Sequence, residues 1–217
     1  VASATASTTY DVANSCRFND GDSPSMAKSI GTPTHANKGT VSCWVKRGAL
    51  TGTTHGIFSC GSDSSNKTQM YFVDEENLEF FNKTGNSATV NIETTRKFRD
   101  VSAWYNIVVA WDTTQGVAAN RVKIYINGTQ ETTLNTATYP AEDEVIRANV
   151  SGETFVVGAL QGPALYLDGY IAEFVFIDGL QLAATSFGEF DEDSPTIWKP
   201  IDVSGLTFGN NGFYLDF

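Results

Sequence analysis

The sequence has 217 residues, with 14 Lys and Arg against 25 Asp and Glu, a net charge of −11 and a pI near 4.5. This acidity argues against nucleic acid as a partner, because nucleic-acid binding needs a basic surface that displaces counterions from phosphates. No apolar run approaches the roughly 18 residues of a spanning helix, so insertion into a membrane is not expected.

Short segments of alternating apolar and polar residues follow one another along the chain. Such alternation is typical of half-buried β-strands, and the Gly, Ser, Thr and Asn between the segments are typical of turns. We expect strands at 15–19, 40–47, 56–60, 69–73, 78–82, 88–92, 104–111, 121–126, 154–158, 165–167 and 170–177. Segment 104–111 is the most apolar and is predicted to be a central strand covered on both faces. One turn of helix is expected at 183–187.

Three dipeptides predict turns between strands. Asn127-Gly128 is expected to form a type I′ turn, and Asp168-Gly169 and Asp178-Gly179 carry the same hairpin signal. In the segment between the two Asp-Gly pairs, Glu173 and Asp178 are expected to face solvent.

The pattern as a whole predicts an all-β fold, a two-sheet antiparallel β-sandwich. We interpret residues 1–14 as an N-terminal arm or linker and residues 15–187 as the sandwich. Residues 188–217 are interpreted as a C-terminal extension that packs on the sandwich or on a partner subunit.

The chain has three cysteines, Cys16, Cys43 and Cys60, an odd number without close metal-type spacing. They are predicted to be free thiols that pack as small hydrophobic residues, with a Cys43–Cys60 bridge as the alternative.

The order of these motifs resembles the concanavalin A-like lectin/glucanase superfamily, in its laminin G-like jelly-roll branch, over residues 18–182. The matching residues are Trp44, Trp104, Asp112, Asn127, Gly128, Gly169, Ile171 and Glu173. More narrowly, the chain resembles virion proteins of tailed bacteriophages, which carry such a domain on tail fibres, spikes or capsid decorations. This resemblance rests on RFNDGDS near the start and on FIDGLQL, WKP and GNNGFYLDF near the end. The superfamily includes lectins, glycan hydrolases and inert structural modules, so the resemblance implies the fold and leaves the function to the site.

A hydrolase of this superfamily would carry a Glu-x-Asp-x-x-Glu pattern on one strand, with paired carboxylates facing a cleft. The nearest text, Glu189 to Ser194, lacks the third carboxylate and is bracketed as a loop by Gly188 and Pro195. We therefore expect that the protein is not an enzyme.

A sugar site would combine an exposed aromatic ring with amide side chains that hold hydroxyl groups. The candidates are Tyr71, Tyr166 and Tyr170 with Asn66, Gln69, Asn82 and Gln161, and Trp44 and Phe72 are further candidate rings. Packing in the core is the alternative for each ring, and Trp104 and Trp111 are predicted to be structural.

Members of the laminin G-like branch often hold calcium, so a structural Ca²⁺ is the cofactor to consider. Loop acids Asp63, Asp112 and Asp168 are its candidate ligands, although an Asp before Gly is commonly a turn residue. Trp198, Phe213 and Tyr214 are candidates for an interface with a neighbouring subunit, and Trp198 alternatively anchors the extension.

The expected function is a non-enzymatic module at the virion surface that contacts other virion subunits and binds a host surface glycan. Resemblance to phage fibres implies a homo-oligomer, with a trimer as the typical case. An extracellular carbohydrate-binding or adhesion domain of a cellular organism is the alternative. A structural decoration without ligand comes third and a glycan hydrolase last.

Overall fold

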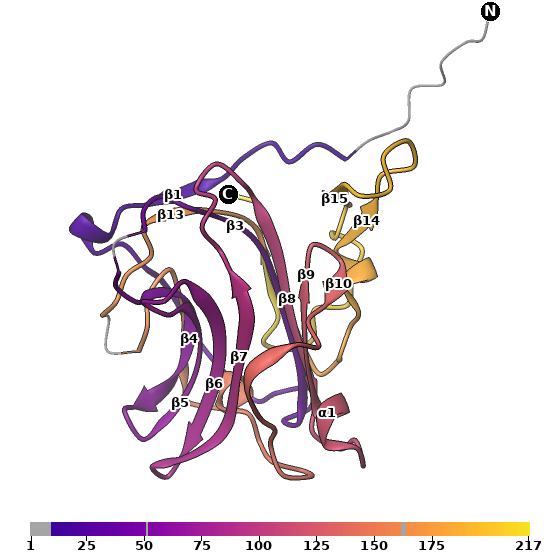
Figure 1. The fold of residues 1–217 in the computed structure, drawn as a ribbon. Coiled ribbons are helices and arrows are strands. Elements are labelled where there is room, and N and C mark those ends of the chain that lie inside the picture. The colour runs from indigo at the N-terminus through magenta and orange to yellow at the C-terminus, as the bar shows by residue number, and fades with distance from the viewer. Residues whose placement is uncertain (1–9, 51, 162–163) are drawn as a thin grey trace, which may run out of the picture.

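The computed structural model describes residues 10–50, 52–161 and 164–217. Two antiparallel sheets of seven strands each pack face to face, as Figure 1 shows, which confirms the predicted two-sheet sandwich. Strands β4 to β7 belong to one layer and β3, β8 and β9 to the other. Most of the predicted arm, residues 1–9, lies outside the described residues.

Sheet A has the strand order β1-β13-β3-β8-β9-β10, and β16 also pairs with β13. Its strands are β1 (Cys16–Phe18), β3 (Lys38–Arg47), β8 (Tyr105–Asp112), β9 (Val122–Ile126), β10 (Thr129–Gln130), β13 (Gly169–Asp178) and β16 (Phe213–Leu215).

Sheet B has the order β11-β7-β6-β5-β4-β12-β2. Its strands are β2 (Met26–Ser29), β4 (His55–Asp63), β5 (Asn66–Phe72), β6 (Asn77–Thr84), β7 (Ser87–Lys97), β11 (Leu134–Thr138) and β12 (Thr154–Val157).

The remaining elements are short. They are the helical turns η1 (Asp20–Asp22), α1 (Ala118–Arg121), η2 (Arg147–Asn149) and η3 (Ala184–Ser186), and a two-stranded ribbon of β14 (Gly188–Phe190) and β15 (Trp198–Pro200). Across the described ranges, none of the helices has the length and apolar character that crossing a membrane requires.

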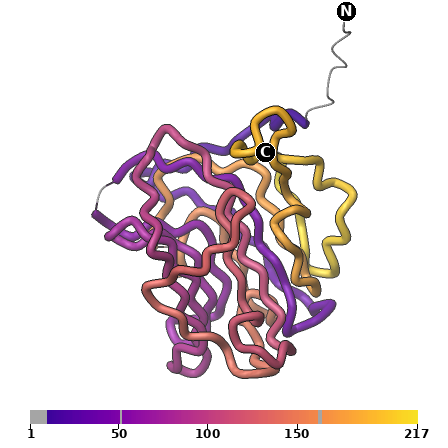
Figure 2. Tube along the Cα trace, turned by 45° about the vertical axis from the view of Figure 1, so that its right-hand side comes forward, coloured from indigo at the N-terminus to yellow at the C-terminus, as the bar shows by residue number. Residues whose placement is uncertain are grey.

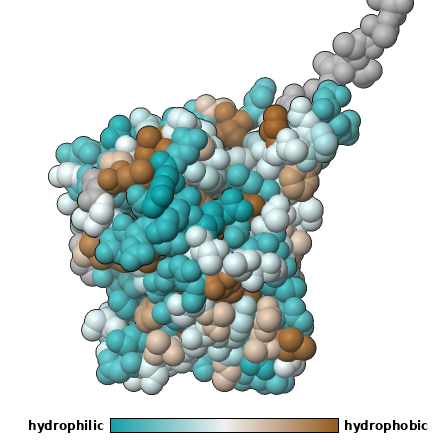
Figure 3. Space-filling view, viewed as in Figure 1, coloured by the Kyte–Doolittle hydropathy of each residue, from teal (hydrophilic) through white to brown (hydrophobic). Residues whose placement is uncertain are grey.

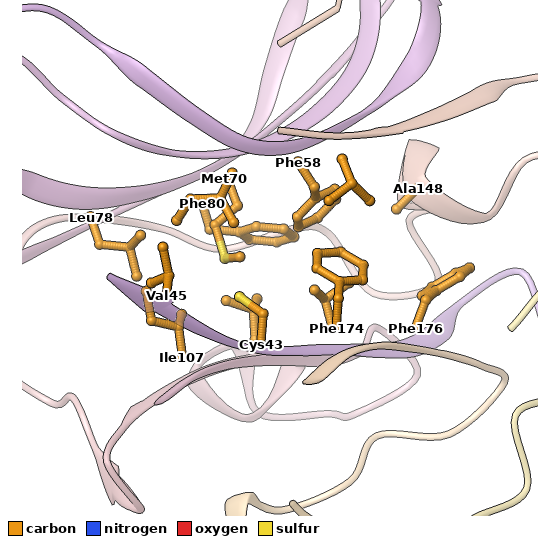
Figure 4. Close-up of a cluster of buried hydrophobic side chains, with 14 of the residues drawn as sticks. Cys43, Val45, Phe58, Met70, Leu78, Phe80, Ile107, Ala148, Phe174 and Phe176 are labelled. Atoms are coloured by element: carbon orange, nitrogen blue, oxygen red, sulfur yellow. The ribbon is translucent and has the colours of Figure 1, made fainter. Parts of the chain in front are cut away.

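The core lies between the sheets and is filled by the inward half of each alternating strand. Figure 4 shows Phe58, Met70 and Phe80 from sheet B facing Cys43 and Phe174 from sheet A. Phenylalanine rings supply much of this contact, because each buried aromatic ring removes a large apolar area from water.

Strand β8 confirms the prediction of a central strand covered on both faces. Ile107 and Val109 point into the core, while Val108 is buried in a second cluster on the outer face of sheet A. The strand expected at 165–167 does not form; a single bridge between Leu160 and Ala164 precedes it. Strands β2 and β11 were not expected, because both are polar edge strands whose order comes from their partners β12 and β7.

Both Asp-Gly dipeptides lie at the ends of β13 and not in hairpin turns, so this part of the prediction is wrong. Strand β13 pairs with β1, β3 and β16, which are all remote in the sequence. Asp178 is only 1% exposed, and its carboxylate accepts hydrogen bonds from Thr34 N, Asn211 N and Asn149 Nδ2. It therefore ties loops together rather than facing solvent.

Glu173 forms an irregularity in the middle of β13. Its φ is +51°, and the register with β3 shifts between Ala172 and Val175. Glu173 is 5% exposed, and its Oε2 accepts hydrogen bonds from Tyr10 Oη at 3.0 Å and Tyr214 Oη at 2.6 Å. The expectation that Glu173 faces solvent is therefore also wrong.

The chain after β13 covers the outer face of sheet A, and Figure 2 shows this yellow segment along one side of the sandwich. Trp198 is 7% exposed, and its Nε1 donates a hydrogen bond to Asn106 Oδ1 at 3.0 Å. Gly128 and Gly188 lie against the indole ring, and a Cβ on either would overlap it. Trp198 therefore anchors the extension on sheet A, which was the alternative to an interface role.

The turn at Asn127-Gly128 is confirmed, because both residues have the positive φ that a type I′ turn requires, +48° and +78°. The three cysteines are free, as predicted. Burial raises the pKa of the Cys43 and Cys60 thiols to about 12, so these side chains behave as inert core residues.

Candidate functional site

A hollow of about 330 Å³ opens on the outer face of sheet A. We call it the tryptophan hollow; its lining residues are Val12, Ala13, Asn14, Ser15, Trp44, Trp104, Ala172 and Pro200. Figure 1 shows the N-terminal arm passing above sheet A toward the β14–β15 ribbon. The arm and the ribbon both contribute residues to the lining of the hollow.

The two indole rings reach this face for different reasons. Trp44 points outward from β3, because it lies between Cys43 and Val45, whose side chains point into the core. Trp104, which was predicted to be structural, immediately precedes β8, is half-buried and also lines the hollow. Sequence alternation indicated that Trp44 points outward, but nothing in it revealed that Trp104 lies beside the same hollow.

Tyr170 extends the aromatic surface beside Trp104. Its ring meets the Trp104 ring edge-on, with the centroids 6.4 Å apart. The Arg17 guanidinium lies 5.2 Å from the Tyr170 centroid and also reaches Asp168 at 3.4 Å. This cation–π contact orients the ring of one predicted sugar-binding residue near the hollow.

The wall made by the arm is held by a triad of hydrogen-bonded side chains. Tyr10 Oη lies 2.9 Å from Tyr214 Oη, and both hydroxyls reach Glu173. Burial raises the pKa of both tyrosines, and the neighbouring Glu173 carboxylate adds to this. The arm at residues 12–15 is thereby fixed against sheet A.

The opposite wall depends on the extension. Pro200 ends β15 two residues after the buried Trp198. Lys199 lies 3.4 Å from Glu189 and 3.6 Å from Asp191, which joins the ribbon to the loop that follows β14. Two carboxylates of the segment nearest to a glucanase pattern, Glu189 and Asp191, are thus engaged in ion pairs.

The structure distributes the other predicted sugar-binding residues over several places. Gln69 and Tyr71 lie on the outer face of sheet B, and Asn66 lies at the β4–β5 turn beside Asp63. Tyr166 is half-buried in the segment before β13, and Gln161 lies in the loop after β12.

Asn82 cannot contact a ligand in this structure, which corrects its assignment. It is fully buried and bonds to Thr68 Oγ1, Thr89 Oγ1 and Arg147 N. Its place in the alternation of β6 turns it toward the core side with Leu78 and Phe80.

The outer face of sheet B is partly covered around Gln69. Gln69 is only 5% exposed although its neighbours Thr68 and Met70 occupy the core side of β5. Next to it, burial raises the pKa of Tyr71, whose hydroxyl is bonded to Glu79. Burial also raises the pKa of Glu79, and the nearby Glu93 contributes to the rise.

The three aspartates proposed as calcium ligands are not brought together. The Asp63 carboxylate accepts hydrogen bonds from the backbone N–H groups of Ser65 and Asn66, and the Asp168 carboxylate lies beside the Arg17 guanidinium. Among the described residues, no group of three His, Cys, Asp or Glu side chains forms a metal-binding cluster.

The Asp112 carboxylate, at the end of β8, is already bonded to other side chains of the same chain. Burial opposes its ionisation, but hydrogen bonds from Thr114 and Gln115 and the Lys38 ammonium at 3.2 Å outweigh this and lower the pKa to about 2. The side chain therefore stabilises the loop after β8.

The remaining predicted interface residues lie in β16, which completes sheet A within the chain. Phe213 packs against the main core, and Tyr214 stacks on Phe208 with the rings 6.4 Å apart. On the face seen in Figure 3, hydrophilic side chains prevail and hydrophobic ones form small scattered groups.

Comparison with known proteins gives the family. Residues 19–182 match the family described as "Concanavalin A-like lectin/glucanases superfamily", with a laminin G-type profile. The chain therefore belongs to the concanavalin A-like lectin/glucanase superfamily. No curated protein sequence matches the chain.

Solved structures share the fold at low sequence identity. A heptameric SAP-like pentraxin from Limulus polyphemus superposes with a TM-score of 0.56 at 20% identity, over 81% of this chain and 80% of that chain. Domains LG4-5 of the mouse laminin α1 chain superpose with a TM-score of 0.53 at 14% identity, over 93% of this chain and 48% of that chain. At these identities the likeness defines the fold alone.

Proposed function

We propose that the chain is a non-enzymatic carbohydrate-binding module and that the tryptophan hollow receives the sugar. The observation that carries this proposal is the pair of half-buried indole rings, Trp44 and Trp104, that line one open hollow. The apolar C–H face of a pyranose covers such rings well, because indoles offer a large rigid apolar area.

The size and chemistry of the hollow support a small sugar ligand. Its volume of about 330 Å³ lies at the lower end of the range of about 300–1,000 Å³ for ligand pockets, which suits one or two sugar rings. Asn14 and Ser15 at its edge supply side chains that hydrogen-bond hydroxyl groups. An aromatic floor with a few polar groups is the usual composition of a binding pocket.

A binding role without hydrolysis agrees with the carboxylates of the extension. Glu189 and Asp191 share Lys199 as their ion-pair partner. Their position in and after β14 serves the packing of the extension, so we assign them no part in acid–base chemistry.

We further propose that the module is displayed on the surface of a tailed-phage virion as a homo-oligomer, in contact with other virion subunits. The support is the phrase-level likeness of both ends of the chain to such proteins, together with the heptameric state of the pentraxin that shares this fold. Repetition of a weak sugar site would multiply its apparent affinity. Light scattering on the purified chain tests this part: a monomer at all concentrations would contradict it.

A glycan array on the purified protein tests the sugar site. We expect saturable binding by the wild type and at least a tenfold loss in Trp104→Ala, since burial of one aromatic contact is worth roughly 1.5–3 kcal/mol. The matched control is Tyr139→Ala, a half-buried aromatic that packs against the main core and does not line the hollow, which should keep the wild-type binding. No binding by a folded wild type, or unchanged binding in Trp104→Ala, would contradict the proposal.

A further inference from the structure

Two lysines face each other on the outer face of sheet B, on the side of the sandwich opposite the tryptophan hollow. Lys67 of β5 and Lys83 of β6 are direct cross-strand partners. Both are half-buried and both point away from the core, since their neighbours Thr68 and Asn82 are the buried members of the strands. We call them the lysine pair.

The lysine pair lacks the partner that opposed ammonium groups normally have. Within the described ranges no carboxylate lies within ion-pair distance of either Nζ. Like charges directly opposite each other on a sheet destabilise it, so the two lysines lower the stability of the fold and gain no ion pair in exchange. In a protein of net charge −11, such an unneutralised positive site suits an acidic ligand.

The next row along the same face suits the ring of a sugar. Gln69, Phe81 and Asn91 are consecutive cross-strand partners on β5, β6 and β7. Asn91 Oδ1 is shielded from solvent and has no hydrogen-bond partner within the described chain, so it leaves an acceptor for a hydroxyl group. Phe81 is half-buried between the two amides and offers an aromatic floor.

A wall bounds this row on the β4 side. Ser59, the cross-strand partner of Gln69, donates its hydroxyl hydrogen to Ala159 O at 3.0 Å. The segment after β12 therefore lies over β4, beside Gln69.

Two glutamates define the far end of the same face and limit the charge of the ligand. Glu79 and Glu93 are cross-strand partners, four residues along β6 from Lys83. Four strand residues span about 13 Å at about 3.3 Å each, which exceeds the Debye length of about 8 Å at physiological ionic strength. The lysine end therefore attracts an anion with only a reduced opposing effect of the glutamates, while the glutamate end repels any further negative charge.

We propose that this face is a second ligand site, for a glycan residue that carries a single carboxylate. The carboxylate lies between Lys67 and Lys83, and the ring lies over Phe81 with its hydroxyl groups on Gln69 and Asn91. The site shares no residue with the tryptophan hollow, so it goes beyond the function proposed above. Densely charged chains, such as heparin or nucleic acid, are disfavoured because their next charges would meet Glu79 and Glu93.

Titrations monitored by amide chemical shifts test this site, with acidic disaccharides and their neutral counterparts as probes. The panel pairs cellobiouronic acid with cellobiose and includes free glucuronate and galacturonate at millimolar concentrations. We expect carboxylate-dependent shifts at Lys67, Gln69, Lys83 and Asn91, and binding weaker by about tenfold for the neutral partner.

Variants separate the two sites. Lys67→Gln/Lys83→Gln should lose the carboxylate-dependent binding by about tenfold or more and keep the wild-type melting temperature or exceed it. Lys28→Gln, an exposed lysine of β2 in the same sheet, is the matched control and should bind as the wild type does. Trp104→Ala should leave binding at the lysine pair unchanged, so the two proposed sites can be tested independently of each other.

Three outcomes would overturn the proposal. The first is the absence of carboxylate-dependent shifts at the lysine pair across the whole panel. The second is wild-type binding by the Lys67→Gln/Lys83→Gln variant. The third is tighter binding of heparin than of the monocarboxylates at the same residues, which would define a general polyanion patch instead.

Discussion

Replacing Trp198 by alanine should release the C-terminal extension from the outer face of sheet A. The indole is 7% exposed and fills the centre of the second apolar cluster, and its Nε1 bonds to Asn106 Oδ1 at 3.0 Å. Removal of a buried Trp costs about 3–5 kcal/mol, and the lost hydrogen bond leaves the buried Asn106 oxygen unsatisfied. For a chain of this size the melting temperature should fall on the order of 10 °C.

Urea unfolding followed by tryptophan fluorescence and limited proteolysis measures this effect. Trp198→Phe is the matched control, since it keeps an aromatic ring and loses the hydrogen bond, and it should cost about 1–2 kcal/mol. We expect new protease cleavage within residues 180–212 in Trp198→Ala, and weaker sugar binding because Pro200 forms a wall of the hollow. A loss below about 1 kcal/mol without new cleavage would refute the role of Trp198 as the anchor.

Three further predictions concern single positions. Gly128→Ala should lower the free energy of unfolding in urea by about 2–4 kcal/mol, because a Cβ there overlaps Trp198 and the φ is +78°. Gly85→Ala is the control: its φ is +56° but the space around it is open, so it should cost only about 1 kcal/mol. Equal losses in the two variants would contradict this reasoning. The depressed pKa of Asp112, about 2 against 3.8, gives a stabilisation of about 2 kcal/mol that is present above pH 4 and is lost as the pH falls toward 2. The stability difference between the wild type and Asp112→Asn should therefore shrink over that range, and a constant difference would be inconsistent with it. With its thiol pKa raised to about 12, Cys43 should resist iodoacetamide at pH 8 until the protein unfolds, as mass spectrometry of the modified peptide would show.

Strand alternation predicted most of the sandwich, because it reports a local property: which residues of a segment face the core. It placed β3 and β8 within two residues of their observed bounds and identified β8 as central. It could not find β2 and β11, whose polar sequences become strands only through hydrogen bonds to β12 and β7.

Turn signals succeeded only where the turn is local. Asn127-Gly128 joins β9 to β10 directly, so its dipeptide was sufficient. Asp178-Gly179 carries the same kind of hairpin signal, but its carboxylate binds Thr34 and Asn211 from loops remote in the sequence. Nothing in a dipeptide distinguishes these two cases.

The candidate sites depend even more on distant contacts. The tryptophan hollow needs the arm, β3 and the extension at once, so composition suggested aromatic binding without locating it. The lysine pair follows from the register of β5 against β6, and the sequence alone does not specify register. Asn82 failed as a candidate because its residue type suggested exposure, whereas its alternation with Leu78 and Phe80 places it on the core side, where it bonds to the buried Thr68.

The interruption at Glu173 has a consequence for the connectivity that this fold permits. Strands β16 and β1 run in the same direction along one edge of β13, with Leu215 opposite Phe174 and Cys16 opposite Ile171. The two strands are thus in line, head to tail, separated by three residues of β13 or about 10 Å. A circular permutant that links residue 217 to residue 16 through a few residues, and opens at the exposed turn 85–86, should keep both pairings with β13. The pairing of β1 and β16 with β13 therefore does not depend on which of these two strands comes first in the chain.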